Sequence, residues 1–169
     1  MDVRLRRART SDVRAIRALI DHYADDRILL SKATVTLYED VQEFWVAEGS
    51  GTVESTVVGC GALHVMWEDL AEVRTLAVHP AWHGQGVGSL LLGRVLDTAR
   101  ELGVSRVFTL TFQTDFFAHH GFVPIDGTPV SSGVYEQLLR SYDEGIAEFL
   151  ELERVKPNTL GNIRMLCYL

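Results

Sequence analysis

The residues with the clearest chemical pattern form a glycine-rich turn at positions 77–88, which read Ala-Val-His-Pro-Ala-Trp-His-Gly-Gln-Gly-Val-Gly. An apolar run precedes this turn and a long amphipathic pattern follows it. The first backbone amides of a helix have no partners within the helix, and together with the helix dipole they attract anions. Glycine lets a phosphate approach the backbone closely, because no β-carbon blocks it. The turn therefore predicts a phosphate-binding site.

Known glycine turns differ in spacing from this one. A Rossmann dinucleotide site needs G-x-G-x-x-G in the first turn of a doubly wound sheet, whereas Gly84, Gly86 and Gly88 are spaced G-x-G-x-G after several predicted strands. A Walker loop needs a lysine before its Ser or Thr, and the pair Gly88-Ser89 lacks it. The pyrophosphate of coenzyme A remains as the phosphate ligand. A plain connector between strand and helix remains as the alternative without a ligand.

No residues have the spacing of a metal site. His119 and His120 are adjacent, so they cannot share one helix face, and no H-E-x-x-H pattern occurs. The two cysteines, Cys60 and Cys167, are far apart and belong to no ligand pattern. We therefore expect no metal, and we expect both cysteines to be reduced residues of the core.

The composition is that of an acidic globular chain. Its 169 residues suffice for one domain with a full core, and the formal net charge is -7. Phosphates repel such a chain, so we expect neither nucleic acid nor anionic membrane as a partner. No apolar run reaches membrane-spanning length, and residues 1–4 lack the apolar core of a signal peptide. These features predict a cytoplasmic protein.

The elements that position the turn follow from the spacing of apolar residues. Residues 91–99 repeat at helical spacing, Gly103 ends this helix, and residues 10–12 offer an N-cap for an earlier one. Gly59 and Gly61 indicate a bulge or a close backbone approach within a strand. Strands are predicted at residues 3–7, 44–47, 57–67, 72–78, 107–111 and 163–168, helices near residues 34–42, 115–120 and 134–141, and loops at residues 25–33 and 48–55.

Hairpins come first in this order, and a strand–helix–strand unit follows. Antiparallel neighbours can be joined by short turns, whereas a parallel pair needs a crossover helix. The order therefore predicts an α/β (α+β) fold, in which a mixed, mostly antiparallel sheet carries helices on both faces.

The segment from the strand through the turn to the sequence Phe-Phe-Ala-His-His-Gly-Phe at residues 116–122 resembles the GNAT acyl-CoA N-acetyltransferases. Their pyrophosphate loop reads [RQ]-x-x-G-x-[GA], and here His83 stands at the Arg or Gln position. The resemblance covers residues 3 to about 124 and implies the GNAT fold. It also implies acetyl-CoA as the acetyl donor. The cofactor-binding residues that it implies are Leu76, Ala77, Val78, His83, Gly84, Gln85, Gly86, Val87, Gly88 and Phe117.

Further segments resemble the acetyltransferase part of N-acetylglutamate synthases, above all the short, stand-alone bacterial form. These are residues 28–32 (Ile-Leu-Leu-Ser-Lys), 72–78 (Glu-Val-Arg-Thr-Leu-Ala-Val), 108–111 (Phe-Thr-Leu-Thr) and 161–166 (Gly-Asn-Ile-Arg-Met-Leu). This resemblance implies transfer of an acetyl group to the α-amine of glutamate, at the start of arginine synthesis, with glutamine as a second acceptor. It implies one domain over residues 1–169. Residues 126–169 would serve the substrate site and could pair with a second copy in a homodimer.

The same resemblance implies roles for individual residues. Glu72 would act as the general base through a water molecule, and Thr111 matches the hydroxyl of a proposed acid. The N–H of Leu76 or Ala77 would face the thioester oxygen. Structural roles stay open for Glu72, as a solvated carboxylate at a strand end, and for Thr111, as a β-branched strand residue. Tyr135 and Tyr142 are further candidates for the acid.

A substrate with two carboxylates needs cations, and Lys32, Arg74 and Arg164 match basic positions of the synthases. Each could instead be a surface cation, and Arg74 could pair with Glu72 and lower its pKa. Acetylation of a polyamine, drug or protein amine is a second function, which these cations oppose. A non-catalytic acyl-CoA sensor is a third, which Glu72 and the intact turn oppose.

Overall fold

The computed structural model describes residues 2–24, 29, 32–50, 55–158 and 162–169. The chain forms two compact units. Unit 1 consists of Met1–His64 and Val73–Thr98, and unit 2 consists of Val65–Glu72 and Ala99–Leu169. The expected loop at residues 25–33 falls mostly outside the described residues, as do Ile28, Leu30, Ser31 and Gly161 of the synthase-like segments.

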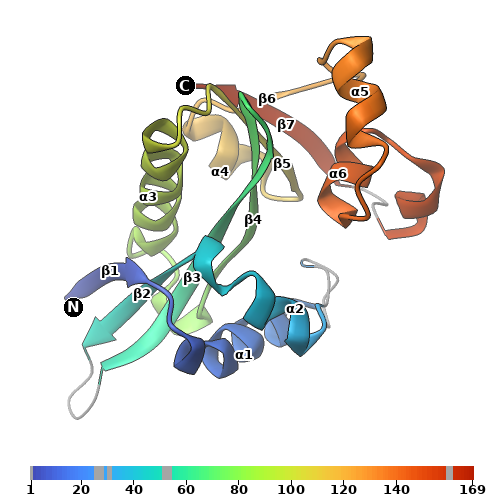
Figure 1. The fold of residues 1–169 in the computed structure, drawn as a ribbon. Coiled ribbons are helices and arrows are strands. Elements are labelled where there is room, and N and C mark those ends of the chain that lie inside the picture. Colours follow the sequence, from blue (N-terminus) through green and yellow to red (C-terminus); the bar gives the residue numbers. More distant parts are fainter. Residues whose placement is uncertain (1, 25–28, 30–31, 51–54, 159–161) are drawn as a thin grey trace. The chain divides into compact units, whose positions relative to one another are not determined.

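Figure 1 shows the helices and strands along the chain. The strands are β1 (Val3–Arg7), β2 (Phe44–Ser50), β3 (Ser55–Trp67), β4 (Leu70–Val78), β5 (Arg106–Thr111), β6 (Val123–Pro124) and β7 (Ile163–Tyr168). The α-helices are α1 (Val13–Ala24), α2 (Thr34–Glu39), α3 (Val87–Glu101), α4 (Thr114–His119), α5 (Ser132–Leu138) and α6 (Glu144–Phe149). Short 3-10 helices cover Thr10–Asp12, Val41–Glu43, Pro80–Trp82 and Glu153–Asn158.

The strands follow the order β1-β2-β3-β4-β5-β7-β6. The pairs β1–β2, β2–β3, β5–β7 and β6–β7 are antiparallel, and β4 and β5 pair in parallel. The predicted mixed, mostly antiparallel sheet is confirmed. Several predicted boundaries were wrong, among them those of the helix predicted near 134–141, which covers Ser132–Leu138. The strand predicted at 44–47 continues to Ser50, which pairs with Ser55, and the helix predicted at 34–42 ends at Glu39.

In unit 1, helices cover both faces of the strands. The apolar side of α1 packs with Leu37 of α2 against alternate residues of β2 and β3. This core contains Val13, Ile16, Leu19, Ile20, Leu37, Phe44, Val46, Cys60, Ala62 and Ala77. Burial of such side chains is the main favourable contribution to folding. Cys60 is buried and free, as predicted.

Helix α3 packs on the other face of the same strands. A β-carbon added to Gly59 would lie 2.9 Å from Leu91 of α3, so the predicted close approach is confirmed. The indole N–H of Trp45 in β2 donates to the Thr98 hydroxyl at 3.0 Å. The pairing of β2 with β3 also shifts register between Ala47 and Glu48, beside Gly59. This bulge and the missing side chains bring α3 close to the strands.

Unit 2 has its own core on one face of β5 and β7. Helices α5 and α6 contribute Leu138, Ile146 and Phe149, which pack with side chains of the strands. The ring of Phe108 meets the ring of Phe149 edge to face, with centroids 5.2 Å apart. Consecutive strand residues point to opposite faces, so β5 and β7 present a second face, where buried, free Cys167 lies near Gly121.

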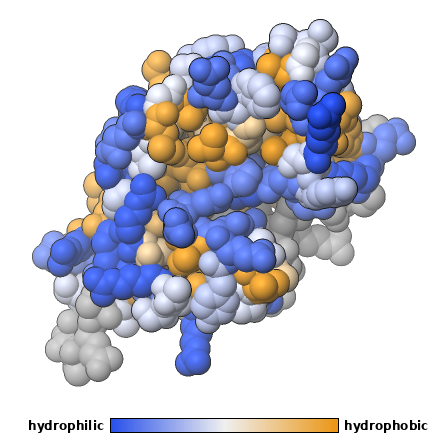
Figure 2. Space-filling view, in the orientation of Figure 1, coloured by the Kyte–Doolittle hydropathy of each residue, from blue (hydrophilic) through white to orange (hydrophobic). Residues whose placement is uncertain are grey.

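None of the described helices is long and apolar enough to cross a membrane. On the face of the molecule that Figure 2 shows, hydrophilic residues are spread widely, and hydrophobic residues form smaller groups between them.

Candidate active site

The glycine turn joins β4 to α3 in a conformation that only glycine adopts easily. Gly84 and Gly86 have φ angles of 72° and 80°, in the left-handed region. Among the described residues, a β-carbon at either position would meet no atom within 4 Å, so this part of the structure leaves open space beside the turn. Residues 83–86 are exposed, and α3 then runs for 15 residues from Val87. This geometry makes the turn and the start of α3 suited to an anion.

His83 and Tyr23 both contact the carbonyl oxygen of Val78, immediately before the turn. His83 Nε2 lies 2.9 Å from Val78 O and 2.7 Å from the Tyr23 hydroxyl, and that hydroxyl donates to the same carbonyl. Burial raises the pKa of Tyr23, so its hydroxyl remains a neutral donor. Tyr23 was missed from the sequence, because its contact with residues 78 and 83 depends on the packing of α1.

The backbone of β4 is strained three residues before its end. Thr75 is 9% exposed and has a φ angle of 57°, a region that β-branched residues rarely adopt. Such a conformation costs about 1–3 kcal/mol and persists only where the surroundings enforce it. The strained residue directly precedes Leu76 and Ala77, whose N–H groups were predicted to face the thioester. Strain at this place is typical of functional sites.

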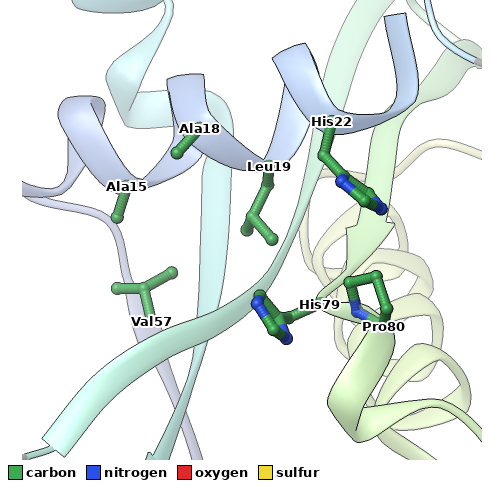
Figure 3. A pocket seen from close by; sticks show the side chains of 7 residues that line it. All are labelled: Ala15, Ala18, Leu19, His22, Val57, His79 and Pro80. Carbon is green, nitrogen blue, oxygen red and sulfur yellow. The ribbon is translucent and has the colours of Figure 1, made fainter. Parts of the chain in front are cut away.

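A small pocket opens in unit 1 between α1 and the ends of β3 and β4 (Figure 3). Its volume is about 250 Å³, and it is lined by Ala15, Ala18, Leu19, His22, Val57, His79 and Pro80. The Nδ1 atom of His79 accepts a hydrogen bond from the N–H of Ala81 at 3.2 Å. His79 therefore fixes the backbone that leads into the glycine turn.

The predicted substrate cations of unit 1 lie in one electrostatic neighbourhood. Burial and the charge of Glu43 raise the pKa of Asp40, and the charges of Lys32, Arg74 and His64 act in the opposite direction. Lys32 and Arg74 are both half-buried. The structure thus brings these cations near the same carboxylate, although they are 42 residues apart in the sequence.

The predicted base, Glu72, is buried in unit 2. It is 6% exposed and pairs with Phe108 of β5 in the parallel ladder. The pKa of Glu148 in α6 is raised to about 7, first by burial and then by the charges of Glu72 and Glu144. The alternative of a solvated carboxylate at a strand end is therefore wrong. Glu148 was missed from the sequence, where it reads as one more acidic residue of a short helix.

Arg164 of β7 is a half-buried cation and not a fully exposed one. Its side chain is 11% exposed, and its Nη2 atom donates to the carbonyls of Gly127, at 2.8 Å, and Phe149. Burial lowers its pKa, while the acidic groups around it, first Glu151, oppose that shift. Removing a cation from water is unfavourable unless an opposite charge or hydrogen-bond acceptors compensate for the lost hydration.

Two other predicted residues have structural partners in unit 2. Thr111, the last residue of β5, is 8% exposed, and its hydroxyl accepts the N–H of Gln113 at 2.8 Å. No hydrogen bond donated by this hydroxyl is found in the part of the chain that the structure describes. Phe117 is 5% exposed and packs edge to face on Phe122, with centroids 5.1 Å apart. Its predicted contact with coenzyme A stays a prediction.

Residues 13–122 match the model of the acetyltransferase (GNAT) family. An amino-acid acetyltransferase of Mycobacterium tuberculosis is 59% identical over 98% of this chain and 94% of its own length. An amino-acid acetyltransferase of Shewanella oneidensis is 38% identical over 75% of this chain, but over only 28% of its own length.

Solved structures agree with these relatives. Rv2747 of Mycobacterium tuberculosis, solved in complex with CoA, is 58% identical with a TM-score of 0.93, and the match covers 98% of this chain and 99% of that one. N-acetylglutamate synthase of Neisseria gonorrhoeae, complexed with coenzyme A and N-acetyl-glutamate, is 26% identical with a TM-score of 0.77 over 100% of this chain and 35% of that one. The chain therefore belongs to the GNAT family of acetyltransferases.

Proposed function

We propose that this acetyltransferase moves the acetyl group of acetyl-CoA to the α-amine of L-glutamate, with L-glutamine as a second acceptor. The product, an N-acetylated amino acid, would enter arginine synthesis in the cytoplasm. The observation that carries the proposal is the 59% identity, over nearly the whole chain, to an amino-acid acetyltransferase. The geometry of both units supports it independently.

The glycine turn supports the cofactor part of the proposal. The pyrophosphate of acetyl-CoA would bind the backbone amides from His83 to Gly88, at the positive end of the α3 dipole. The pantetheine arm would run along Leu76–Val78 as an added strand. Because Val78 O already accepts from Tyr23 and His83, the arm must share this carbonyl or replace one of these donors.

Direct transfer needs a neutral amine, a donor for the oxyanion and a proton for the leaving thiolate. The amine nitrogen would attack the thioester carbon, and the carbonyl oxygen would gain negative charge beside the N–H of Leu76 or Ala77. A water molecule would carry the amine proton to Glu72. The carbon–sulfur bond would then break, and the coenzyme A thiolate would take up a proton, for which Thr111 is the candidate donor.

The cations support an acidic acceptor. Lys32 and Arg74 share the surroundings of Asp40, and Arg164 presents a half-buried guanidinium in unit 2. A guanidinium binds a carboxylate through two parallel hydrogen bonds. A polyamine would meet like charge at each of these positions.

The decisive experiment measures thiol release from acetyl-CoA with a panel of free amino acids, a polyamine and an aminoglycoside. The proposal expects turnover with glutamate or glutamine and little with the cationic amines. Turnover confined to cationic amines would overturn the acceptor assignment. Binding of coenzyme A without turnover on any amine would favour an acyl-CoA sensor instead.

A further inference from the structure

Unit 2 contains a group of buried polar atoms without hydrogen-bond partners among the described residues. These atoms are Glu148 Oε1, Asn162 Oδ1, Arg164 Nε and Arg164 Nη1. A buried polar atom without a partner loses its hydrogen bonds to water and forms none within the protein, which is unfavourable. Native proteins leave few such atoms, and those that remain require an explanation. A bound ligand is one explanation, because this group contains both hydrogen-bond donors and acceptors without partners among the described residues.

The guanidinium of Arg164 is anchored at one end and available at the other. Its Nη2 atom is used by the carbonyls of Gly127 and Phe149. Its Nη1 atom lies 3.2 Å from a carboxylate oxygen of Glu151, a side chain that is 53% exposed, in an ion pair without hydrogen-bond geometry. Nε and Nη1 therefore each offer an N–H donor on different sides of the guanidinium, and each donor can bind one oxygen of a carboxylate or a carboxamide.

Glu148 supplies the opposite chemistry in the same surroundings. It is 5% exposed, and its Oε1 atom has no partner among the described residues. The charged groups that act on it are Glu72 from β4, Glu144 from its own helix and Arg164 from β7. Burial and the two carboxylates raise its pKa to about 7, so both protonation states are populated near neutral pH.

The side-chain ends of glutamine and glutamate form different hydrogen bonds with such a carboxyl. A carboxamide offers an oxygen to Arg164 and an N–H to an ionised Glu148. A carboxylate also offers an oxygen to Arg164, but its second oxygen repels an ionised Glu148 and accepts an O–H only from the protonated form.

We propose that Arg164 and Glu148 hold the side-chain end of the amino-acid acceptor, and that the carboxyl of Glu148 is the group that distinguishes glutamine from glutamate. This inference rests on the proposed function. Protonated Glu148 donates to the γ-carboxylate of glutamate, and ionised Glu148 accepts from the γ-amide of glutamine. The same site thus takes either acceptor, and pH sets the preference.

The first test needs only the wild-type protein. The ratio of kcat/KM for glutamine to that for glutamate is measured from about pH 6 to about pH 8.5. Titration of the α-amine and of the base affects both acceptors alike, so the ratio isolates the side-chain end. The proposal expects the ratio to rise about fivefold or more as Glu148 ionises. A ratio that does not change with pH would overturn it.

The second test uses Glu148→Gln, whose side-chain amide donates an N–H to a carboxylate at every pH. We expect its preference to shift at least about tenfold toward glutamate and to lose its pH dependence. Glu136→Gln, an exposed change on α5, is the matched control and should behave like the wild type. Equal loss for both acceptors in Glu148→Gln would show a merely structural role.

Should Glu148→Gln fail to fold, Glu148→Asp keeps the carboxyl and should keep the pH dependence of the ratio at lower rates. Failure of the proposed function looks different from failure of this inference. In the first case neither glutamate nor glutamine is acetylated, and in the second both are acetylated with a constant ratio.

Discussion

Glu72 shows how much the surroundings of one residue change its chemical meaning. Glu68 lies only four positions earlier in the sequence, yet Glu68 is exposed and Glu72 is 6% exposed. Glu72 lies in a strand beside a second buried carboxyl, Glu148, which responds to its charge. A carboxylate kept in such a place at the cost of desolvation is a candidate for proton transfer.

Replacement of Glu72 by Gln should lower kcat/KM by about 10²–10⁴, because the amide cannot accept the amine proton. Steady-state thiol release measures this loss, and calorimetry should find acetyl-CoA affinity nearly unchanged. Glu68→Gln removes an exposed carboxylate from the same stretch and should leave kcat/KM as it was. A Glu72→Gln protein with wild-type kcat/KM would remove Glu72 from the mechanism.

Residues of the proposed site could be predicted where a local pattern or a family motif contains them, and their roles in it stay predictions. The glycines of the turn, Glu72 and the three cations are of this kind. Tyr23 and Glu148 were not, since their significance comes from contacts with residues far away in the chain. The burial of Arg164 was also unforeseen, because an arginine in an alternating strand gives no sign of which face is covered.

The glycine turn is the element on which the cofactor proposal depends. Gly86→Ala places a β-carbon at a φ angle of 80°, which costs about 1–2 kcal/mol of strain in the binding conformation. We expect a rise of about tenfold in the KM for acetyl-CoA with little change in the acceptor KM. Gly93→Ala within α3 is the control, where alanine favours the helix by about 0.5–1 kcal/mol. An unchanged KM for acetyl-CoA in Gly86→Ala would contradict the phosphate site.

A network of charged hydrogen bonds connects β1 and β2 to the residue that precedes α1. Arg6 donates to Asp12 at 2.6 and 2.9 Å and to Glu48 at 2.7 Å, and Asp12 also accepts the N–H of Arg9 at 2.7 Å. The Arg6 hydrogen bond, more than any other cause, holds the pKa of Asp12 below its ordinary value. The stabilisation is therefore present above the ordinary pKa and is lost as pH falls through the lowered one.

Asp12→Asn should accordingly lower the free energy of unfolding at neutral pH by about 2 kcal/mol, because a charge-assisted pair is lost. At acidic pH, where Asp12 of the wild type becomes protonated, the difference between the two proteins should shrink. Urea unfolding at a series of pH values measures both. A difference that stays constant down to the most acidic condition would assign the loss to packing and not to charge.

Most elements were predictable because their apolar spacing matches one period, as in α3 and β1. The strained Thr75 was not, since a β-branched residue within an apolar strand predicts a regular strand. Its conformation is imposed by neighbours: Thr75 is buried, and its carbonyl accepts a weak bond from the thiol of Cys60. Tertiary packing overrides local preference here.

At the scale of the molecule, the net charge of the chain and the charge of the proposed donor, coenzyme A, have the same sign and repel each other. The chain carries a formal net charge of -7, and coenzyme A is itself an anion through its phosphates. Binding must therefore come from local groups, the turn amides and the α3 dipole, acting against the overall field. These groups are part of the folded state alone, since a helix dipole and a fixed turn do not exist in the unfolded chain.

Coenzyme A should therefore stabilise the whole protein against heat. A ligand that binds only the folded state at about 100 times its Kd adds about 2.7 kcal/mol. For a chain of 169 residues this corresponds to a rise in Tm of about 5–10 °C. Differential scanning fluorimetry at rising coenzyme A concentration measures the shift, with Gly93→Ala expected to match the wild type and Gly86→Ala to need about tenfold more ligand for the same Tm. If the wild-type Tm does not respond to coenzyme A, the turn is a plain connector and the donor assignment fails with it.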